Sequence, residues 1–360
     1  MKTSMNRGRF VAFTILTLSL LAGLEAQARD PAPTNTVFTR KPLFESKPKA
    51  PPKCASDKHV SLAPHDYFDE AIIFPGGPFK GCQADTSSER SIKALDDSQM
   101  RRILGSREYA NLKGGTRVFA NFRAAAFDNA KSRYKKINPS GFWVAALDPT
   151  EVEKIIVQTE VFQSLPDIPA AHTQLRLKMF DGKCVQLYSQ DRRYLGQKGP
   201  CVENFLYSIE AMNTLGADVT FDLVKGLKGY FMLAYKMIRL GDKAAYMVDE
   251  AKHPVVQIEL KLEGTEVERL VDAFVSQGTN PDRTEIYDTL RASCTTELYR
   301  VFDKIVVSER APIRNIIAGN FMRLPIFPES YLGLRGLVGQ KLKNLEEEIG
   351  RSRRDLLRIP

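Results

Sequence analysis

Residues 293–296, Ser-Cys-Thr-Thr, contain the side chain best suited to covalent catalysis. Ser293 favours the N-cap of a helix, because its hydroxyl can accept a backbone N–H of the first turn. Leu298 and Phe302 follow at helical spacing, so we expect a helix that begins at Cys294. There the helix dipole and unpaired N–H groups favour the thiolate, the form that attacks carbonyl carbon. The alternative is a small buried hydrophobe that happens to start a helix.

Cysteine count and spacing bear on the state of this thiol. The chain has five cysteines, so at least one stays unpaired in an oxidising compartment. Proximity in the sequence predicts the disulfides Cys54–Cys82 and Cys184–Cys201, although four cysteines allow three pairings. This scheme leaves Cys294 as a thiol. We expect no metal site and no cofactor, because CxxC, HExxH and HxH motifs are absent and histidines number four.

The first 28 residues have the pattern of a secretory signal peptide. A basic start precedes an apolar run over residues 10–24, and Ala26-Gln27-Ala28 predicts cleavage after Ala28. No later run is long and apolar enough to span a bilayer, so we expect a periplasmic protein that is soluble or peripherally membrane-associated. The net charge of +9 fits weak attraction to an anionic membrane or plain solubility. Without a nucleic-acid motif, we expect no nucleic-acid partner.

Composition divides the rest of the chain into four parts. Residues 29–90 form a Pro/Lys-rich extension, in which the first disulfide could close a small lobe. Residues 91–140 are predicted to be a helical segment. Residues 141–338 are predicted to form the main domain, and residues 339–360 a charged C-terminal tail.

Three helices are predicted between residues 91 and 163. They cover residues 96–104, residues 112–136, and a stretch opened by Asp148-Pro149-Thr150.

The main domain combines strand and helix patterns. Alternation over residues 172–179 indicates a half-buried strand. Further strands are predicted at residues 185–188, 205–212, 230–239 and 255–262. Thr265-x-x-Glu268 is typical of a capping box that starts a helix ending at Gly278. Antiparallel strands between two helices indicate an α+β fold.

A cysteine nucleophile needs a base, and His172 is the best candidate. It begins a strand whose polar face also carries Gln174 and Arg176. Alone, this pattern is more often that of a structural histidine. His253 precedes Pro254 at a strand entrance, as turn and surface residues often do. The order histidine on a strand, further strands, then cysteine at a helix start corresponds to a circularly permuted papain-like core.

Three motifs in this order carry a family resemblance. They are residues 172–177 (His-Thr-Gln-Leu-Arg-Leu), residues 208–211 (Ser-Ile-Glu-Ala) and Tyr287-x-x-Leu290-x-x-Ser-Cys-Thr-Thr. Together they resemble the periplasmic domain of the bacterial lipoprotein N-acyltransferase Lnb family, over residues 141–338. The family is similar to permuted papain-like proteins such as NlpC-type peptidases. The resemblance implies a Cys–His pair that carries an acyl group as a thioester.

Roles carried over by position make Cys294 the nucleophile and His172 the base. Backbone N–H groups of Cys294 and Thr295 could stabilise an oxyanion. Glu210 is the candidate third catalytic residue, although a cross-strand salt bridge with Lys or Arg is an equal alternative. The expected substrate-binding residues are Ser208, Ser293, Thr295 and Tyr287, the last of which could simply pack.

The expected function is thiol-dependent acyl transfer or hydrolysis on a lipid or lipoprotein ester. Phospholipid or lipoprotein would then be the substrate, with peripheral membrane contact. One alternative is a cell-wall peptide amidase or peptidase, which an open polar cleft would favour. Another is a non-catalytic envelope binding protein on the same fold, in which Cys294 would be disulfide-bonded or unreactive.

Overall fold

The computed structural model describes residues 54, 60–125, 133–165, 168–217, 219–281, 284–307 and 328–356. The expected signal peptide, most of the extension before residue 60 and residues 308–327 lie outside the described residues. Within the described chain, no helix has both the length and the hydropathy needed to cross a membrane.

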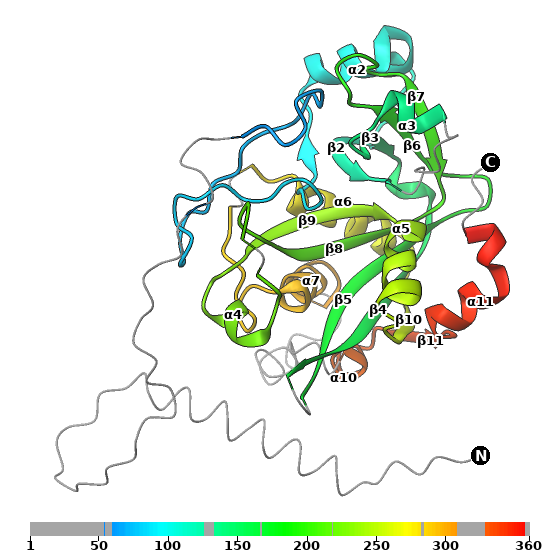
Figure 1. Ribbon diagram of the computed structural model, residues 1–360. Helices are drawn as coiled ribbons and strands as arrows, with labels where there is room; N and C mark the ends of the chain where they lie inside the picture. Colours follow the sequence, from blue (N-terminus) through cyan, green and yellow to red (C-terminus); the bar gives the residue numbers. More distant parts are fainter. Residues whose placement is uncertain are drawn as a thin grey trace, which may run out of the picture. The chain divides into compact units, whose positions relative to one another are not determined.

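One large sheet organises the described chain (Figure 1). Its strand order is β11-β10-β4-β5-β8-β9-β2-β3-β6-β7, with β1 beside β2. Neighbours pair antiparallel except β2 and β9, which are parallel. The strands are β1 (Lys93–Ala94), β2 (Arg117–Arg123), β3 (Phe142–Leu147), β4 (Val152–Leu165), β5 (Ile168–Met179), β6 (Val185–Ser189), β7 (Lys198–Val202), β8 (Asn204–Met212), β9 (Met232–Arg239), β10 (Val255–Leu260) and β11 (Val338–Lys341).

Helices cover both faces of the sheet around β8. The helical elements are α2 (Asp97–Ala110), α3 (Arg133–Ile137), η2 (Pro149–Glu151), α4 (Leu223–Leu227), α5 (Leu240–Ala244), η3 (Ala245–Glu250), α6 (Glu266–Gly278), α7 (Cys294–Phe302), η4 (Asp303–Val307), α10 (Pro328–Leu334) and α11 (Leu345–Leu356). In Figure 1, α5 lies in front of β8 and β9, while α6 and α7 lie behind them.

Alternation along β8 explains this layering. Tyr207 points into the large apolar cluster that α6 and α7 supply with Phe274 and Leu298. Its neighbour Leu206 belongs to a second cluster, on the α5 and α11 side, with Leu345. Because successive side chains of a strand point to opposite faces, one apolar strand anchors helices on both sides. The mixed sheet and helices form an α+β domain.

The helical segment predicted for residues 91–140 is largely wrong. Residues 97–110 are helical, as expected, but residues 117–123 form β2. Both faces of β2 are covered, with Val118, Phe119 and Phe122 buried, so the buried part of its sequence is apolar except for Asn121. Such a run lacks the alternation of a half-exposed strand and can be mistaken for a buried helix. Residues 126–132 of the predicted helix lie outside the described chain.

The helix expected after Asp148 is also wrong. Asp148 and Pro149 start only the 3-10 turn η2, and the chain then enters the long strand β4. The run after Val152 is rich in β-branched residues, which suit a strand. The predicted capping box of α6 does not form either. Thr265 makes no side-chain cap, and the Glu266 carboxylate instead accepts the Glu263 N–H at 2.6 Å.

The remaining strand predictions and both disulfides are confirmed. Residues 172–179, 185–188 and 205–212 lie within β5, β6 and β8, and the later two runs contain β9 and β10. Cys54 is bonded to Cys82, and Cys184 to Cys201. The first disulfide closes the lobe that precedes β1, and the second links the start of β6 to β7.

Candidate active site

The predicted nucleophile occupies the first turn of α7. Ser293 is the N-cap, and its hydroxyl accepts the Thr296 N–H while the Thr296 hydroxyl accepts the Ser293 N–H at 2.7 Å. This reciprocal cap fixes the start of the helix. Cys294 is buried and takes part in neither disulfide. The thiol therefore lies at the N-terminal end of α7, where the helix dipole favours negative charge.

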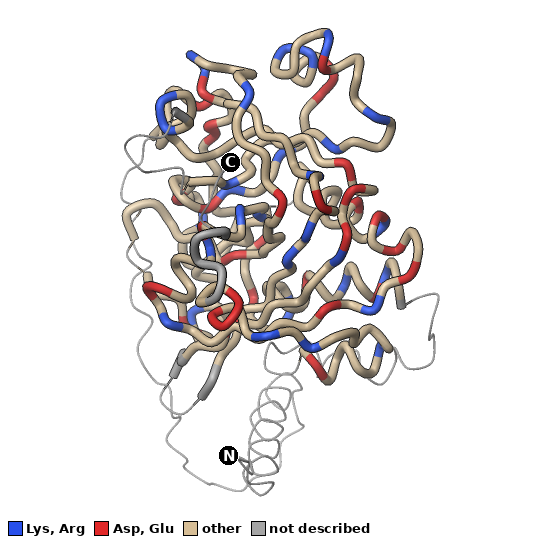
Figure 2. Tube along the Cα trace, turned by 90° about the vertical axis from the view of Figure 1, so that its right-hand side faces the viewer, with Lys and Arg blue, Asp and Glu red and all other residues tan. Residues whose placement is uncertain are grey.

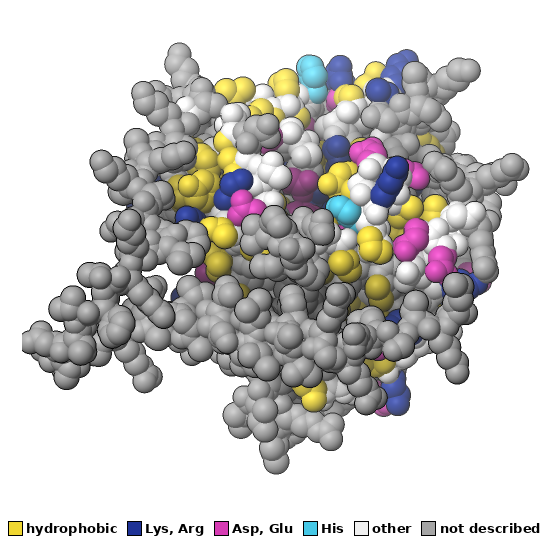
Figure 3. Space-filling view, turned by 60° about the horizontal axis from the view of Figure 1, so that its bottom comes forward, with side chains coloured by type: hydrophobic (Ala, Val, Ile, Leu, Met, Phe, Trp, Pro, Cys, Tyr) yellow, Lys and Arg dark blue, Asp and Glu magenta, His cyan; other side chains and the backbone are white. Residues whose placement is uncertain are grey.

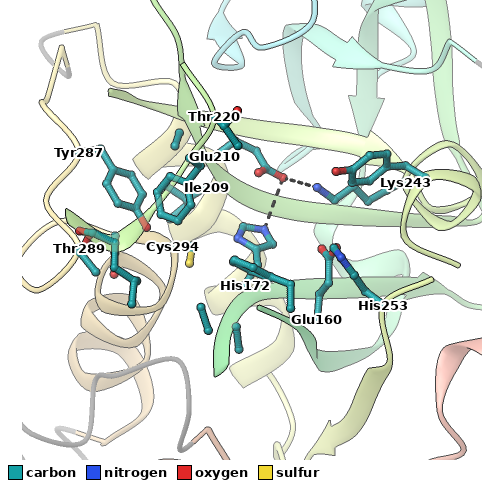
Figure 4. A pocket seen from close by; sticks show the side chains of 18 residues that line it. Glu160, His172, Ile209, Glu210, Thr220, Lys243, His253, Tyr287, Thr289 and Cys294 are labelled. Carbon is teal, nitrogen blue, oxygen red and sulfur yellow. Dashed lines mark hydrogen bonds and ion pairs between the residues drawn. The ribbon is translucent and has the colours of Figure 1, made fainter. Parts of the chain in front are cut away.

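The strands β5 and β8 separate where the site begins. Their pairing runs from Lys178 opposite Asn204 to Leu175 opposite Tyr207. Continuing this register would place His172 opposite Glu210, but the strands have already parted there. The start of α7 lies next to the point where β5 and β8 part. The Cys294 thiol and the His172 imidazole therefore lie close together there (Figure 4).

A chain of polar contacts holds the ring of His172. Its Nε2 atom lies 2.8 Å from Ser208 Oγ and 3.4 Å from Glu210 Oε1. The Ser208 hydroxyl donates to the same carboxylate oxygen at 2.8 Å. Because Nε2 faces Ser208 and Glu210, Nδ1 is the ring nitrogen that faces the Cys294 thiol. The imidazole is thus oriented by β8 and directed toward Cys294 (Figure 4).

Lys243 on α5 forms an ion pair with Glu210. Its Nζ atom is 2.9 Å from Glu210 Oε1, so the carboxylate faces two cationic groups. Burial alone would raise the pKa of Glu210, but the charges of His172 and Lys243 hold it well below its usual range. Glu210 therefore stays ionised, and it forms both the contact to His172 and an ion pair. The lysine comes from α5 and not from a neighbouring strand.

The pKa values of the thiol and the imidazole move in opposite directions. Burial lowers the pKa of His172, but Glu210 and Cys294 outweigh it and raise that pKa to about 10. Burial raises the pKa of Cys294, but the charge and hydrogen bond of His172 bring it below the ordinary thiol value. A thiolate–imidazolium pair is therefore favoured at pH values between the lowered pKa of Cys294 and the raised pKa of His172.

Two further groups fix the thiol. The Tyr287 hydroxyl points at Cys294 within hydrogen-bond range, and its pKa is raised well above the ordinary value by burial and by the thiolate charge. Its ring packs edge-on against Phe221 and Phe231. Tyr287 therefore packs and also contacts the Cys294 thiol. On the other side, Thr295 Oγ1 lies 3.7 Å from the sulfur.

A cavity of about 400 Å³ opens onto this pair. Among the predicted site residues, those that line it are His172, Glu210, Tyr287, Ser293 and Cys294. Ser208 and Thr295 are fully buried and are not among the lining residues. Their substrate-binding role stays a prediction.

Two features of the cavity were missed from the sequence. Lys243 lies on a short helix that no pattern predicted. His253, interpreted as a turn or surface residue, lines the cavity, and its Nδ1 atom is 2.6 Å from Glu160 Oε1. Its ring stacks on Phe162. Glu160 is the cross-strand partner of His172, so this second pair lies beside the first. Within the described chain, no group of three or more acidic, histidine or cysteine side chains could hold a metal ion.

Comparison with known proteins decides the family. Residues 142–318 match the model described as the Lnb N-terminal periplasmic domain. This part of the chain is an Lnb domain. No curated protein and no solved structure matches the chain.

The Lnb domain, as matched, contains every group of the cavity described above, from Glu160 to Cys294. The Cys54–Cys82 lobe precedes it, and α11 follows it. Because the family is a periplasmic domain, its function belongs to the cell envelope. The relation of its fold to permuted papain-like proteins stays a prediction.

Proposed function

We propose that the Lnb domain transfers an acyl group from a lipid ester through a thioester on Cys294. The observation that carries the proposal is the pairing of a buried, depressed-pKa thiol with an imidazole that a carboxylate orients. Nucleophile, base and orienting group are the three parts that covalent acyl transfer requires.

In the first step, the Cys294 thiolate attacks the ester carbonyl carbon and a C–S bond forms. Negative charge collects on the carbonyl oxygen. The backbone N–H groups of Cys294 and Thr295 are the donors available in the first turn of α7, because Ser293 already caps Thr296. The Tyr287 hydroxyl is a third donor near the sulfur. When the C–O bond breaks, His172 gives its proton to the leaving alkoxide.

In the second step, an amine or water attacks the thioester and gives its proton to His172. The C–S bond breaks and the thiolate returns. An amine acceptor yields an amide, and water yields a free acid, so the same residues serve transfer and hydrolysis. Glu210 keeps the imidazolium favourable in both steps, and Lys243 keeps Glu210 charged.

The cavity lining favours an acyl substrate. Its apolar lining residues are Phe162, Ala170, Ala171, Ile209, Phe221 and Leu223. Apolar side chains near the nucleophile can bury a hydrocarbon chain, which is worth about 0.8 kcal/mol per methylene group. The charged and histidine side chains of the lining include Glu160, Glu210, Lys243 and His253. These polar groups support the second candidate, an amidase or peptidase acting on cell-wall peptide.

A chain-length series tests the proposal. The purified protein is mixed with p-nitrophenyl acetate and p-nitrophenyl octanoate, and intact mass is followed on Cys294. We expect an acyl adduct that hydroxylamine removes, formed at least about tenfold faster with octanoate, because the longer chain buries more methylene groups.

Three variants serve as controls. Cys294→Ser should form no hydroxylamine-labile thioester, and His172→Ala should slow acylation strongly. Phe221→Asp should reduce the preference for octanoate without abolishing reaction with acetate. Equal rates for both esters would contradict the acyl-chain proposal, and an inert Cys294 would favour a non-catalytic binding protein.

A further inference from the structure

The short helix α4 exposes large apolar side chains beside the cavity. Val224 keeps 39% of its surface exposed and Leu227 keeps 42%. Single exposed apolar residues are ordinary on protein surfaces, but adjacent ones on one turn next to a cavity are not. The position of α4 therefore decides what these side chains can do.

The inner side of α4 is part of the cavity wall. Leu223 lines the cavity, and its carbonyl accepts the Thr289 hydroxyl at 3.1 Å. Gly226 lies so close that a Cβ atom would fall 2.2 Å from Thr289 Oγ1 and 3.2 Å from the Tyr287 ring. One side of the helix thus contacts residues around the thiol, while Val224 and Leu227 face solvent.

A third exposed apolar side chain belongs to the same cavity. Tyr246 on η3 lines it and remains 49% exposed. Figure 3 views the molecule from the side of α4 and the β4–β5 hairpin. Hydrophobic side chains there lie on both sides of a hollow that contains acidic side chains. The apolar surface therefore surrounds the entrance to the site.

The charge on α4 is basic. Lys225 lies on α4, and Lys228 directly follows it as the C-cap residue and is exposed. Lys225 is 3.2 Å from Asp222, which offsets part of its charge. Over the described chain as a whole, basic and acidic residues are interspersed (Figure 2). The combination of apolar and basic side chains at α4 is thus a local feature, of the kind that binds anionic lipid surfaces.

We propose that Val224, Leu227 and Tyr246, with the α4 lysines, form a docking surface for an anionic lipid bilayer. The surface area of three side chains is well below the roughly 1,200 Å² that a stable protein–protein interface buries. A bilayer needs no matching shape, only apolar side chains that enter its interface and cations at the headgroups. Docking here would place the cavity entrance against the membrane. Only the further step, delivery of an acyl chain to Cys294, rests on the proposed function.

Vesicle co-sedimentation of the purified protein tests the docking surface. The probes are phosphatidylcholine vesicles with and without phosphatidylglycerol. We expect binding to the anionic vesicles and much weaker binding to the neutral ones. The double variant Val224→Asp/Leu227→Asp should lose at least about tenfold in affinity for anionic vesicles, because charges replace both inserted side chains.

Phe180→Asp is the matched control. Phe180 is 49% exposed and follows β5 at the end away from His172, so its substitution should leave vesicle binding unchanged. Iodoacetamide labelling of Cys294 without vesicles is measured on every variant. Unchanged labelling shows that the double variant is folded. It also separates the two proposals, since a reactive thiol with no vesicle binding overturns docking alone.

Two other outcomes would also overturn the proposal. If the double variant binds vesicles like the unsubstituted protein, the membrane contact lies elsewhere. If vesicles do not bind but the protein self-associates and the double variant is monomeric, the surface is occupied by a second copy.

Discussion

The hydroxyl of Thr295 donates a hydrogen bond to the hydroxyl of Thr173 at 3.1 Å, and both side chains are fully buried. Each threonine directly follows a residue of the Cys294–His172 pair in the sequence. This contact joins the first turn of α7 to β5 across the core. A hydrogen bond between the neighbours of Cys294 and His172 therefore helps to hold the thiol beside the imidazole.

Breaking this contact should affect both stability and reactivity. Thr295→Val keeps the shape of the side chain but leaves the buried Thr173 hydroxyl without this donor. We expect a loss of about 1–3 kcal/mol in the free energy of unfolding. We also expect several-fold slower labelling of Cys294, because the helix start is less firmly held.

A double variant and a control complete this test. Thr173→Val/Thr295→Val should cost less than the sum of the single changes, since no hydroxyl is then left over. Thr279→Val removes a hydroxyl that donates to the Val275 carbonyl on α6, so it should leave labelling unchanged. Additive effects of the two site substitutions would show that the hydroxyls do not act as a pair.

The pH dependence of thiol labelling should follow the ion pair. The thiolate forms above the lowered pKa of Cys294, and the imidazolium persists until the pH passes about 10. Iodoacetamide labelling should therefore remain fast below the ordinary thiol pKa, and decline as the pH falls through the lowered pKa of Cys294. In His172→Ala nothing from the imidazole offsets the effect of burial, which raises the pKa of Cys294, so labelling should require a pH above the ordinary thiol pKa. Identical profiles for the two proteins would refute the pair.

Glu210 and Lys243 should act as a coupled unit. Glu210→Gln removes the charge that raises the pKa of His172, so the thiolate becomes less favourable and labelling near neutral pH should fall about tenfold. Lys243→Met leaves Glu210 with one cation fewer and should cost about 3–5 kcal/mol of stability, the usual effect of breaking a buried pair. The double variant should recover part of that stability. Chemical denaturation measures the free energy of unfolding, and iodoacetamide labelling measures the reactivity of Cys294. If the stability losses of the two single variants simply add in the double variant, Glu210 and Lys243 are not coupled.

Thiol counts should report the two disulfides. Denatured, non-reduced protein should contain one reactive thiol, on Cys294, because four of the five cysteines are paired. Cys54→Ser/Cys82→Ser should destabilise the protein by about 2–4 kcal/mol, since the unfolded chain regains the freedom of that loop. Peptide mapping after alkylation checks the count. Three thiols in the denatured native chain would mean that one disulfide is absent in solution.

The sequence predicted the centre of the site because its signals are local. Ser293 as an N-cap and the alternation around His172 are readable from a few adjacent residues, and their order suggested the pair. Lys243 was missed because α5 is short and its lysine matters only through contact with Glu210, 33 residues earlier. The His253–Glu160 pair joins residues 93 apart, which no local pattern can reveal.

The errors in the fold have a related cause. β2 is buried on both faces, so the alternation that marks a strand is hidden. Asp148-Pro149 does start a helical turn, but the β-branched residues after Val152 end it at once. The start signal at Asp148 was thus detected correctly, while the length of the element that follows depended on contacts with distant parts of the chain.

The order of the cysteines in the chain bears on how the two disulfides form. A chain that emerges into the periplasm N-terminus first presents Cys54, then Cys82, then Cys184, then Cys201. Each native disulfide joins one cysteine to the next that emerges. Oxidation in order of arrival therefore produces the native pairs without any isomerase. Cys294 arrives last, when every earlier cysteine already has its partner, and so the thiol reaches its helix unmodified.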